Sequence, residues 1–142
     1  MPPSIVAAYI IINSTATATS TFRGNCRRAR TTMVYFCVTA LDMLGALDEV
    51  LKAEGRAQIT EWVYNNQITS DKAFSWRHCG FKGGTFVGQP YEDERGYFSH
   101  DYDHSHVAQT YSALAILRSL GDDFTRVDRA AVLRAVGGLQ QA

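Results

Sequence analysis

Apolar residues recur at intervals of three and four along two separate stretches of this chain, and no other feature constrains its fold as strongly. The first stretch contains Val34, Cys37, Val38, Leu41, Leu44 and Leu47. Such spacing is typical of an α-helix that buries one face. An offset of 73 residues places Leu41, Leu44 and Leu47 on Leu114, Leu117 and Leu120, and Ile59, Val63 and Gln67 on Val132, Val136 and Gln140. We therefore predict a long helix followed by a shorter one, occurring twice.

Repeated helical hairpins can bury their apolar faces only against neighbouring hairpins, and about three or more units are usually needed for stability. Two units are present in this sequence. We therefore predict an all-α fold in the form of an incomplete helical array. At its open end we expect exposed apolar side chains that promote association, namely Leu114, Leu117, Val132 and Val136.

Glycines and capping residues divide the chain further. We predict helices from Thr31 to about Gly55, from Gln58 to Gln67, from His104 to Leu120 and from Asp128 toward Leu139. Gly121 suits a left-handed helix end and Asp128 suits an N-cap. Five glycines and Pro90 fall within residues 69–100, which indicates a long irregular loop. Residues 14–20 are of low complexity and have no helical stripe, so we expect a disordered leader over residues 1–29 and one domain over residues 30–142.

Composition excludes several classes of protein. The 14 basic and 14 acidic side chains give no net charge, whereas a nucleic-acid-binding protein usually carries a basic excess. The longest apolar run, residues 5–12, is far shorter than the roughly 20 residues of a membrane span. Three unevenly spaced cysteines favour a reducing compartment, and we expect a cytoplasmic location.

The N-terminal leader leaves one alternative open. Four arginines (Arg23, Arg27, Arg28 and Arg30) precede the first acidic residue, Asp42, in a region rich in Ser and Thr. This bias is also found in organelle transit peptides. We favour a disordered leader over a targeting signal because the segment 14–20 is of low complexity.

Three segments carry a resemblance to a known family. They are Arg30–Leu44 (RTTMVYFCVTALDML), Cys79–Pro90 (CGFKGGTFVGQP) and Tyr102–Tyr111 (YDHSHVAQTY), the last continuing to Leu120-Gly121-Asp122-Asp123. In order and spacing they resemble the β subunits of protein prenyltransferases, specifically those of the type I geranylgeranyltransferase branch. The resemblance covers about residues 30–142. The Cys-Gly-Phe-Lys-Gly stretch and the Leu-Gly-Asp-Asp-Phe-Thr-Arg-Val run are its most specific parts.

The resemblance implies an α/α toroid, in which inner helices line a funnel and outer helices surround them. The first and third predicted helices would be inner ones. An α subunit would be the partner in a heterodimer. The reaction implied is transfer of a geranylgeranyl group from geranylgeranyl diphosphate to the cysteine of a C-terminal CaaX (CaaL) motif. In the family a zinc ion, held by Asp, Cys and His, activates that cysteine thiol.

The catalytic centre of the family is not recognisable in this sequence. The family's zinc ligands include an Asp-x-Cys pair, and the sequence contains none. The zinc histidine and the diphosphate-binding basic residues belong to later parts of the family chain. We therefore expect no catalytic and no metal-binding residue here, and a fragment that is inactive alone. The alternatives are a non-catalytic module that binds the α subunit and a decayed gene copy.

Four residues match positions in the family's substrate funnel. Thr32 corresponds to a small residue beside the far end of the isoprenoid, where the farnesyl enzyme carries tryptophan, and Phe36 would extend that wall. His106 and Ala108 correspond to positions around the C-terminal residue of the peptide substrate. Ser105 stands where the family usually has glycine and could crowd the wall. Ordinary helix packing, or a histidine satisfied by nearby backbone, would account for the same residues.

A competing hypothesis concerns the segment His100–His106 (HDYDHSH). Its imidazoles and carboxylates are ligand types that suit a divalent ion such as zinc. We regard a solvated loop as the better interpretation of this segment.

Overall fold

The computed structural model describes residues 30–71, 75–84 and 105–139. Within them the chain is built mainly of four helices: α2 (Arg30–Met43), α3 (Leu47–Tyr64), α4 (Val107–Ser119) and α5 (Arg129–Leu139). Two short strands, β1 (Gln67–Ile68) and β2 (Gly80–Phe81), pair antiparallel with Gln67 opposite Phe81. The prediction of an all-α fold is confirmed. No helix in the described part of the chain is long and apolar enough to cross a bilayer.

Helix α2 ends earlier than the apolar spacing predicts. Gly45 adopts a left-handed backbone with φ +64°, and the amide of Ala46 donates to the Leu41 carbonyl at 2.9 Å. These are the features of a Schellman helix end. The prediction that this helix continues to about Gly55 was therefore wrong, and Leu44, expected on its buried face, is exposed.

Helix α3 contains residues that we predicted to belong to two separate helices, one ending near Gly55 and one starting at Gln58. It begins at Leu47 and includes Gly55, so the prediction of a helix starting at Gln58 and reaching Gln67 was wrong at both ends. The helix is kinked at Lys52, whose φ of 53° and ψ of −179° are not helical. Gln67 instead lies in β1. Apolar periodicity did not reveal these boundaries because it runs on across the turn at Gly45.

The ends of α4 follow the prediction closely. His106 is its N-cap, two residues beyond the expected start at His104. Gly121 has φ +80°, and the amide of Asp122 donates to the Leu117 carbonyl at 2.9 Å, so this helix also ends in a Schellman motif. The start of α5 is confirmed as well, because Asp128 Oδ1 accepts a hydrogen bond from the amide of Ala131 at 3.1 Å.

The segment predicted as one long loop is partly regular. Its described part contains a 3₁₀ turn, η2 (Trp76–His78), and the strand β2. Ser70, near its start, donates through its amide to Asp128 Oδ2 at 2.9 Å. Residues 72–74 and 85–104 lie outside the described residues, as does the predicted leader.

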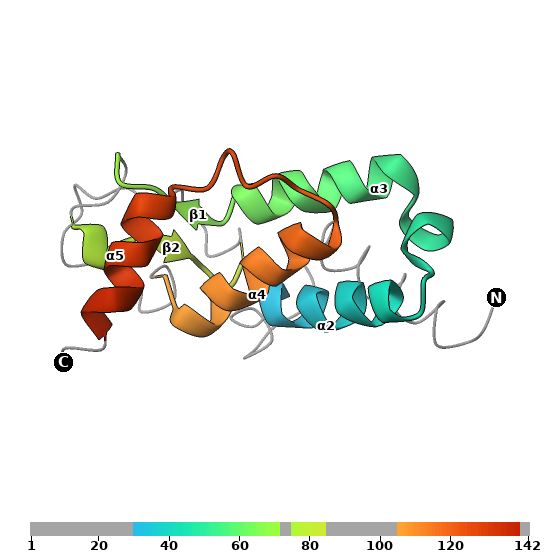
Figure 1. The fold of residues 1–142 in the computed structure, drawn as a ribbon, viewed down its shortest axis with the longest axis horizontal. Helices are drawn as coiled ribbons and strands as arrows, with labels where there is room; N and C mark the ends of the chain where they lie inside the picture. The colour runs from blue at the N-terminus through green and yellow to red at the C-terminus, as the bar shows by residue number, and fades with distance from the viewer. Residues whose placement is uncertain (1–29, 72–74, 85–104, 140–142) are drawn as a thin grey trace.

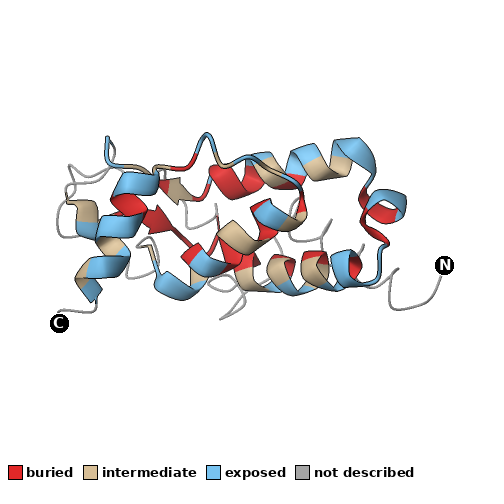
Figure 2. Ribbon diagram, viewed as in Figure 1, coloured by how far each residue is buried: buried red, intermediate tan, exposed pale blue. Residues whose placement is uncertain are grey.

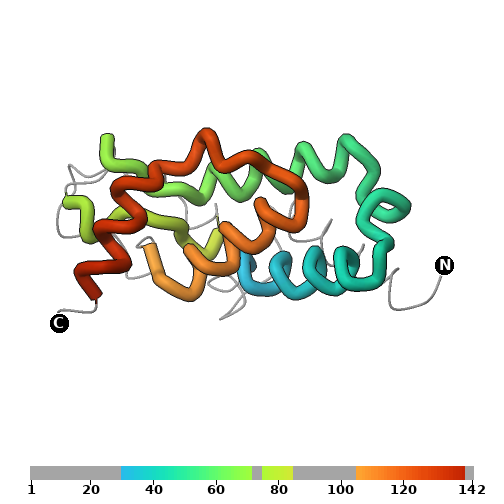
Figure 3. Tube along the Cα trace, in the orientation of Figure 1, coloured from blue at the N-terminus to red at the C-terminus, as the bar shows by residue number. Residues whose placement is uncertain are grey.

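The core forms where α2, α3 and α4 meet. Helices α2 and α3 make a hairpin, and α4 packs along α2 on one side (Figures 1 and 3). Figure 2 shows the buried residues gathered between these elements. The fully buried apolar side chains include Val34, Val38, Leu41, Val63, Phe81, Ile116 and Leu117. Helix α5 stands apart from α2 and packs on η2 and β2.

Close packing of α5 on η2 requires a glycine. A Cβ added at Gly138 would lie 2.8 Å from two carbons of the Trp76 ring, whereas one added at Gly137 would meet nothing within 4 Å. The first distance is well inside van der Waals contact. Gly138 therefore serves the contact between α5 and the 3₁₀ turn.

This difference predicts opposite effects for two neighbouring substitutions. We expect Gly138→Ala to lower the free energy of unfolding by about 1–3 kcal/mol, because the rigid indole must shift. Gly137→Ala should raise it by up to about 1 kcal/mol through helix propensity. Thermal unfolding followed by tryptophan fluorescence would measure both. Equal melting temperatures for the two variants would contradict the contact.

Candidate functional site

One face of the molecule carries aromatic side chains from both α2 and α4. The hydroxyl groups of Tyr35 and Tyr111 lie 3.5 Å apart, and their rings meet edge to face with centroids 5.7 Å apart. The ring of Phe36 lies 5.3 Å from that of Tyr35. Phe36 is 64% exposed and Tyr111 is 62% exposed. We call these three residues the aromatic face.

Polar contacts fix the geometry of this face. The Thr32 hydroxyl, one turn before Phe36, donates to Gln109 Oε1 at 3.2 Å and so joins the first turns of the two helices. The hydrogen bond to Tyr111 raises the pKa of Tyr35 above its ordinary value. The Tyr35 hydroxyl is therefore neutral near pH 7. The result is a surface that is apolar in its rings and uncharged at its edge.

A small hollow lies beside the start of α4. It has a volume of about 190 Å³, and Arg77, Cys79, His106 and Val136 are among the residues that line it. His106 Nδ1 accepts a hydrogen bond from the amide of Ala108 at 3.2 Å. The His106 amide donates to the Phe81 carbonyl at 3.2 Å. His106 is thus an N-cap residue fastened to β2, as its alternative interpretation anticipated.

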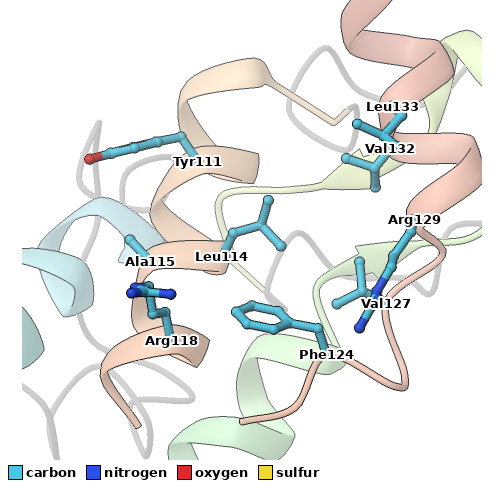
Figure 4. A pocket seen from close by; sticks show the side chains of 9 residues that line it. All are labelled: Tyr111, Leu114, Ala115, Arg118, Phe124, Val127, Arg129, Val132 and Leu133. Carbon is cyan, nitrogen blue, oxygen red and sulfur yellow. The ribbon is translucent and has the colours of Figure 1, made fainter. Parts of the chain in front are cut away.

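A larger hollow, with apolar walls, lies between α4 and α5. It has a volume of about 630 Å³ and is lined by Tyr111, Leu114, Ala115, Arg118, Phe124, Val127, Arg129, Val132 and Leu133. In Figure 4, Leu114 and Val132 face one another across it, and Phe124 and Val127 come from the connecting segment. Arg118 and Arg129 stand on opposite sides. We call this hollow the α4–α5 groove.

The groove corrects the expected list of exposed residues. Leu117 and Val132 are buried, so their predicted exposure was wrong, whereas Leu114 is half-buried and Val136 is exposed. Phe124 and Val127 were missed, because they lie in a connecting segment that has no helical periodicity. Phe124 has a φ of 60°, which local apolar spacing cannot indicate.

Comparison with known proteins assigns the family. The sequence model of the prenyltransferase alpha-alpha toroid domain matches residues 10–142. The chain belongs to this family. It is 35% identical over 109 residues to a protein from Dictyostelium discoideum named geranylgeranyl transferase type-1 subunit beta. It is 34% identical over 119 residues to a protein of the same name from Arabidopsis thaliana.

Coverage differs greatly between this chain and its relatives. The two alignments span 71% and 79% of this chain, but 30% and 29% of the two relatives. The chain therefore matches less than a third of the length of each relative. The family match begins upstream of Arg30, and the division of the chain after residue 29 stays a prediction.

The structure places Thr32 and Phe36 on α2, and His106 and Ala108 at the start of α4. The structure links Thr32 to α4 through Gln109 and leaves Phe36 exposed beside Tyr35. His106 lines the smaller hollow with Cys79 and Val136 and does not belong to the aromatic face. Substrate contact by these four residues stays a prediction.

Ser105 lies against β2. A Cβ added at Gly80, which has φ +137°, would approach Ser105 Cβ to 3.2 Å and Thr110 Oγ1 to 2.7 Å. Ser105 is half-buried there and also lines the smaller hollow. The space beside Ser105 is therefore available only because residue 80 is glycine.

The residues that the structure describes do not fit the zinc ion that the family implies. No group of three or more His, Cys, Asp or Glu side chains converges among them. Burial raises the pKa of Cys37 and of Cys79, and a protonated thiol is a poor metal ligand. His100 to His104, the core of the competing metal hypothesis, lie outside the described residues.

Proposed function

We propose that this chain forms part of the isoprenoid-binding wall in the β subunit of a type I protein geranylgeranyltransferase. The observation that carries the proposal is the aromatic face, where Tyr35, Phe36 and Tyr111 from two neighbouring helices are held together and remain accessible. A prenyl chain is apolar throughout, and burying it against such rings is favourable by about 0.8 kcal/mol per carbon. The names of the two relatives support the choice of lipid.

Thr32 is proposed to set the length of lipid that fits. Its short side chain donates to Gln109 Oε1, and we propose that the far end of the lipid takes the space beside it. Geranylgeranyl exceeds farnesyl by five carbons, which could contribute up to about 4 kcal/mol when fully buried. A tryptophan at this position would occupy that space.

We predict that Thr32→Trp lowers the ratio of geranylgeranyl to farnesyl affinity by roughly tenfold, or about 1.4 kcal/mol. Fluorescent analogues of the two diphosphates, titrated into the chain together with a prenyltransferase α subunit, would measure the ratio. Thr60→Trp, on the partly exposed surface of α3, is the control. An unchanged ratio in Thr32→Trp, or an equal change in the control, would contradict the assignment.

The proposed partners are an α subunit, geranylgeranyl diphosphate and a CaaX-protein C-terminus. We propose that the chain does not transfer the lipid by itself, because its sequence has no Asp-x-Cys pair for the zinc site of the family. Mixing it with α subunit, zinc, geranylgeranyl diphosphate and a CaaL peptide should give no prenylated peptide by mass spectrometry. Transfer above a control without the chain would refute this part of the proposal.

A further inference from the structure

The molecule has an exposed apolar surface at the end of α2, far from the α4–α5 groove. Met43 is 84% exposed and Leu44 is 66% exposed, and Ala40 beside them is also exposed. We call Ala40, Met43 and Leu44 the α2 face. Exposed apolar patches of this kind mark surfaces of association. In the described part of the chain, the α2 face and the α4–α5 groove are therefore both candidate surfaces for association.

The helix ends reveal how the two surfaces are related. In α2 the amide of Gly45 donates to Asp42 and that of Ala46 to Leu41; in α4 the amide of Gly121 donates to Arg118 and that of Asp122 to Leu117. These positions correspond at an offset of 76, the separation of the contacting pair Tyr35 and Tyr111. This offset is three residues longer than the offset of 73 taken from the leucine pattern, and three residues are nearly one helical turn. Both offsets therefore align roughly the same faces of the two helices.

In this register the α2 face corresponds to a surface that is already buried in the molecule. Ala40 and Leu44 correspond to Ile116, which is 0% exposed, and Leu120, which is 7% exposed. Both lie in the core that α4 shares with α2 and α3. The residues of the α2 face thus correspond to those with which α4 packs on the hairpin of α2 and α3.

The groove corresponds to the other side of the same interface. Its residue Leu114 corresponds to Val38, which is fully buried in the core shared with α4. Tyr111 corresponds to Tyr35, whose ring packs on α4. The groove side of α4 therefore corresponds to the side of α2 on which α4 packs. The α2 face of one chain could thus pack on the groove of another as α4 packs on α2 within one chain.

Charge supports a parallel stack of two chains. Arg118 lies on one side of the groove and corresponds in this register to Asp42, an exposed carboxylate beside the α2 face. If a second chain lies against the groove with its α2 parallel to α4, its Asp42 is level with Arg118 along the helix axis. Opposite charges placed at the same height favour this orientation and register.

We propose that two copies of this chain associate head to tail, with the α2 face of one copy seated in the α4–α5 groove of the other. The interface is heterologous, because each copy contributes a different surface. Each dimer keeps one free groove and one free α2 face. Further copies can therefore add, and the assembly grows with concentration.

Sedimentation velocity over a range of concentrations tests the proposal. We expect the full-length chain to form dimers and larger species, and Leu44→Glu and Leu133→Glu each to remain monomeric. Leu133 is 72% exposed and lines the groove. An equimolar mixture of the two variants should give a dimer and nothing larger, since only one intact surface remains on each copy. Leu139→Glu is the matched control, because Leu139 is exposed on α5 outside the groove.

A charge exchange checks the register. Asp42→Arg and Arg118→Asp should each weaken association at least tenfold. Mixing these two variants should restore dimers and larger species, because each surface of one variant then meets the opposite charge on the other. Circular dichroism of every variant should match the unsubstituted chain. Monomeric behaviour of the unsubstituted chain at all concentrations, or assembly that survives Leu44→Glu, would overturn the proposal and leave the groove to a different partner.

Discussion

Replacing Phe81 with alanine should lower the free energy of unfolding by about 3–5 kcal/mol, the range for a phenylalanine lost from a packed core. Phe81 is fully buried in the cluster shared by α2, α3 and α4. Its amide donates to Thr110 Oγ1 at 3.0 Å, and its carbonyl accepts from the His106 amide. No other side chain of β2 reaches the core, since residue 80 is glycine.

Phe36→Ala is the matched control for this prediction. It removes the same ring from a site that is largely exposed, so its effect on unfolding should stay within about 0.5 kcal/mol. Urea denaturation followed by far-ultraviolet circular dichroism would measure both variants. Similar losses for the two phenylalanines would contradict the burial of Phe81 in this cluster.

The Cys-Gly-Phe-Lys-Gly stretch, which carried much of the family resemblance, has a structural reason. Gly80 lies at φ +137° so close to Thr110 that no side chain fits, and Phe81 fills the core behind it. The Lys82 amide donates to the Asn66 carbonyl at 3.0 Å, and the Thr31 hydroxyl donates to the Lys82 carbonyl at 3.2 Å. The stretch thus ties β2 to α2 and to the segment after α3.

Helix capping could be predicted from the sequence where a single residue decides it. Gly121 and Asp128 each act through one local hydrogen-bond pattern, and both were identified correctly. The end of α2 was missed although Gly45 has the same role as Gly121. The apolar spacing continued from Leu44 to Leu47 and suggested an unbroken helix. Tertiary packing, not spacing, places Leu47 in the core and Leu44 in solvent.

The candidate site was predicted only in part because its contacts join distant residues. Thr32 and Phe36 could be picked out on one helix. Gln109, which accepts from Thr32, and Tyr111, which packs on Tyr35, come from another. A single sequence does not show which turn of α4 meets which turn of α2. The offset of 76 became evident only from the hydrogen bonds at the two helix ends.

A polar network joins α3 to the segment between α4 and α5. The Tyr64 hydroxyl donates to Asp122 Oδ1 at 2.5 Å, and the same oxygen accepts from the Phe124 amide at 2.8 Å. The Arg126 guanidinium lies 4.1 Å from the Tyr64 ring centroid and pairs with Glu61. Phe124 has a positive φ, so the backbone turn there is unusual. Asp122 therefore accepts hydrogen bonds both from Tyr64 and from this turn.

Asp122→Ala should therefore lower the free energy of unfolding by about 2–4 kcal/mol, because it removes two hydrogen bonds to a charged group and leaves a buried hydroxyl unpaired. Asp122→Asn keeps an acceptor oxygen and should cost clearly less.

Burial and the bond to Asp122 raise the pKa of Tyr64. Its contribution to stability is complete below the unfolded tyrosine pKa near 10 and is lost as pH rises toward the higher folded value. Urea midpoints measured at pH 8 and above pH 10 should thus fall more for the unsubstituted chain than for Tyr64→Phe. An equal fall would show that ionisation of Tyr64 is not linked to folding.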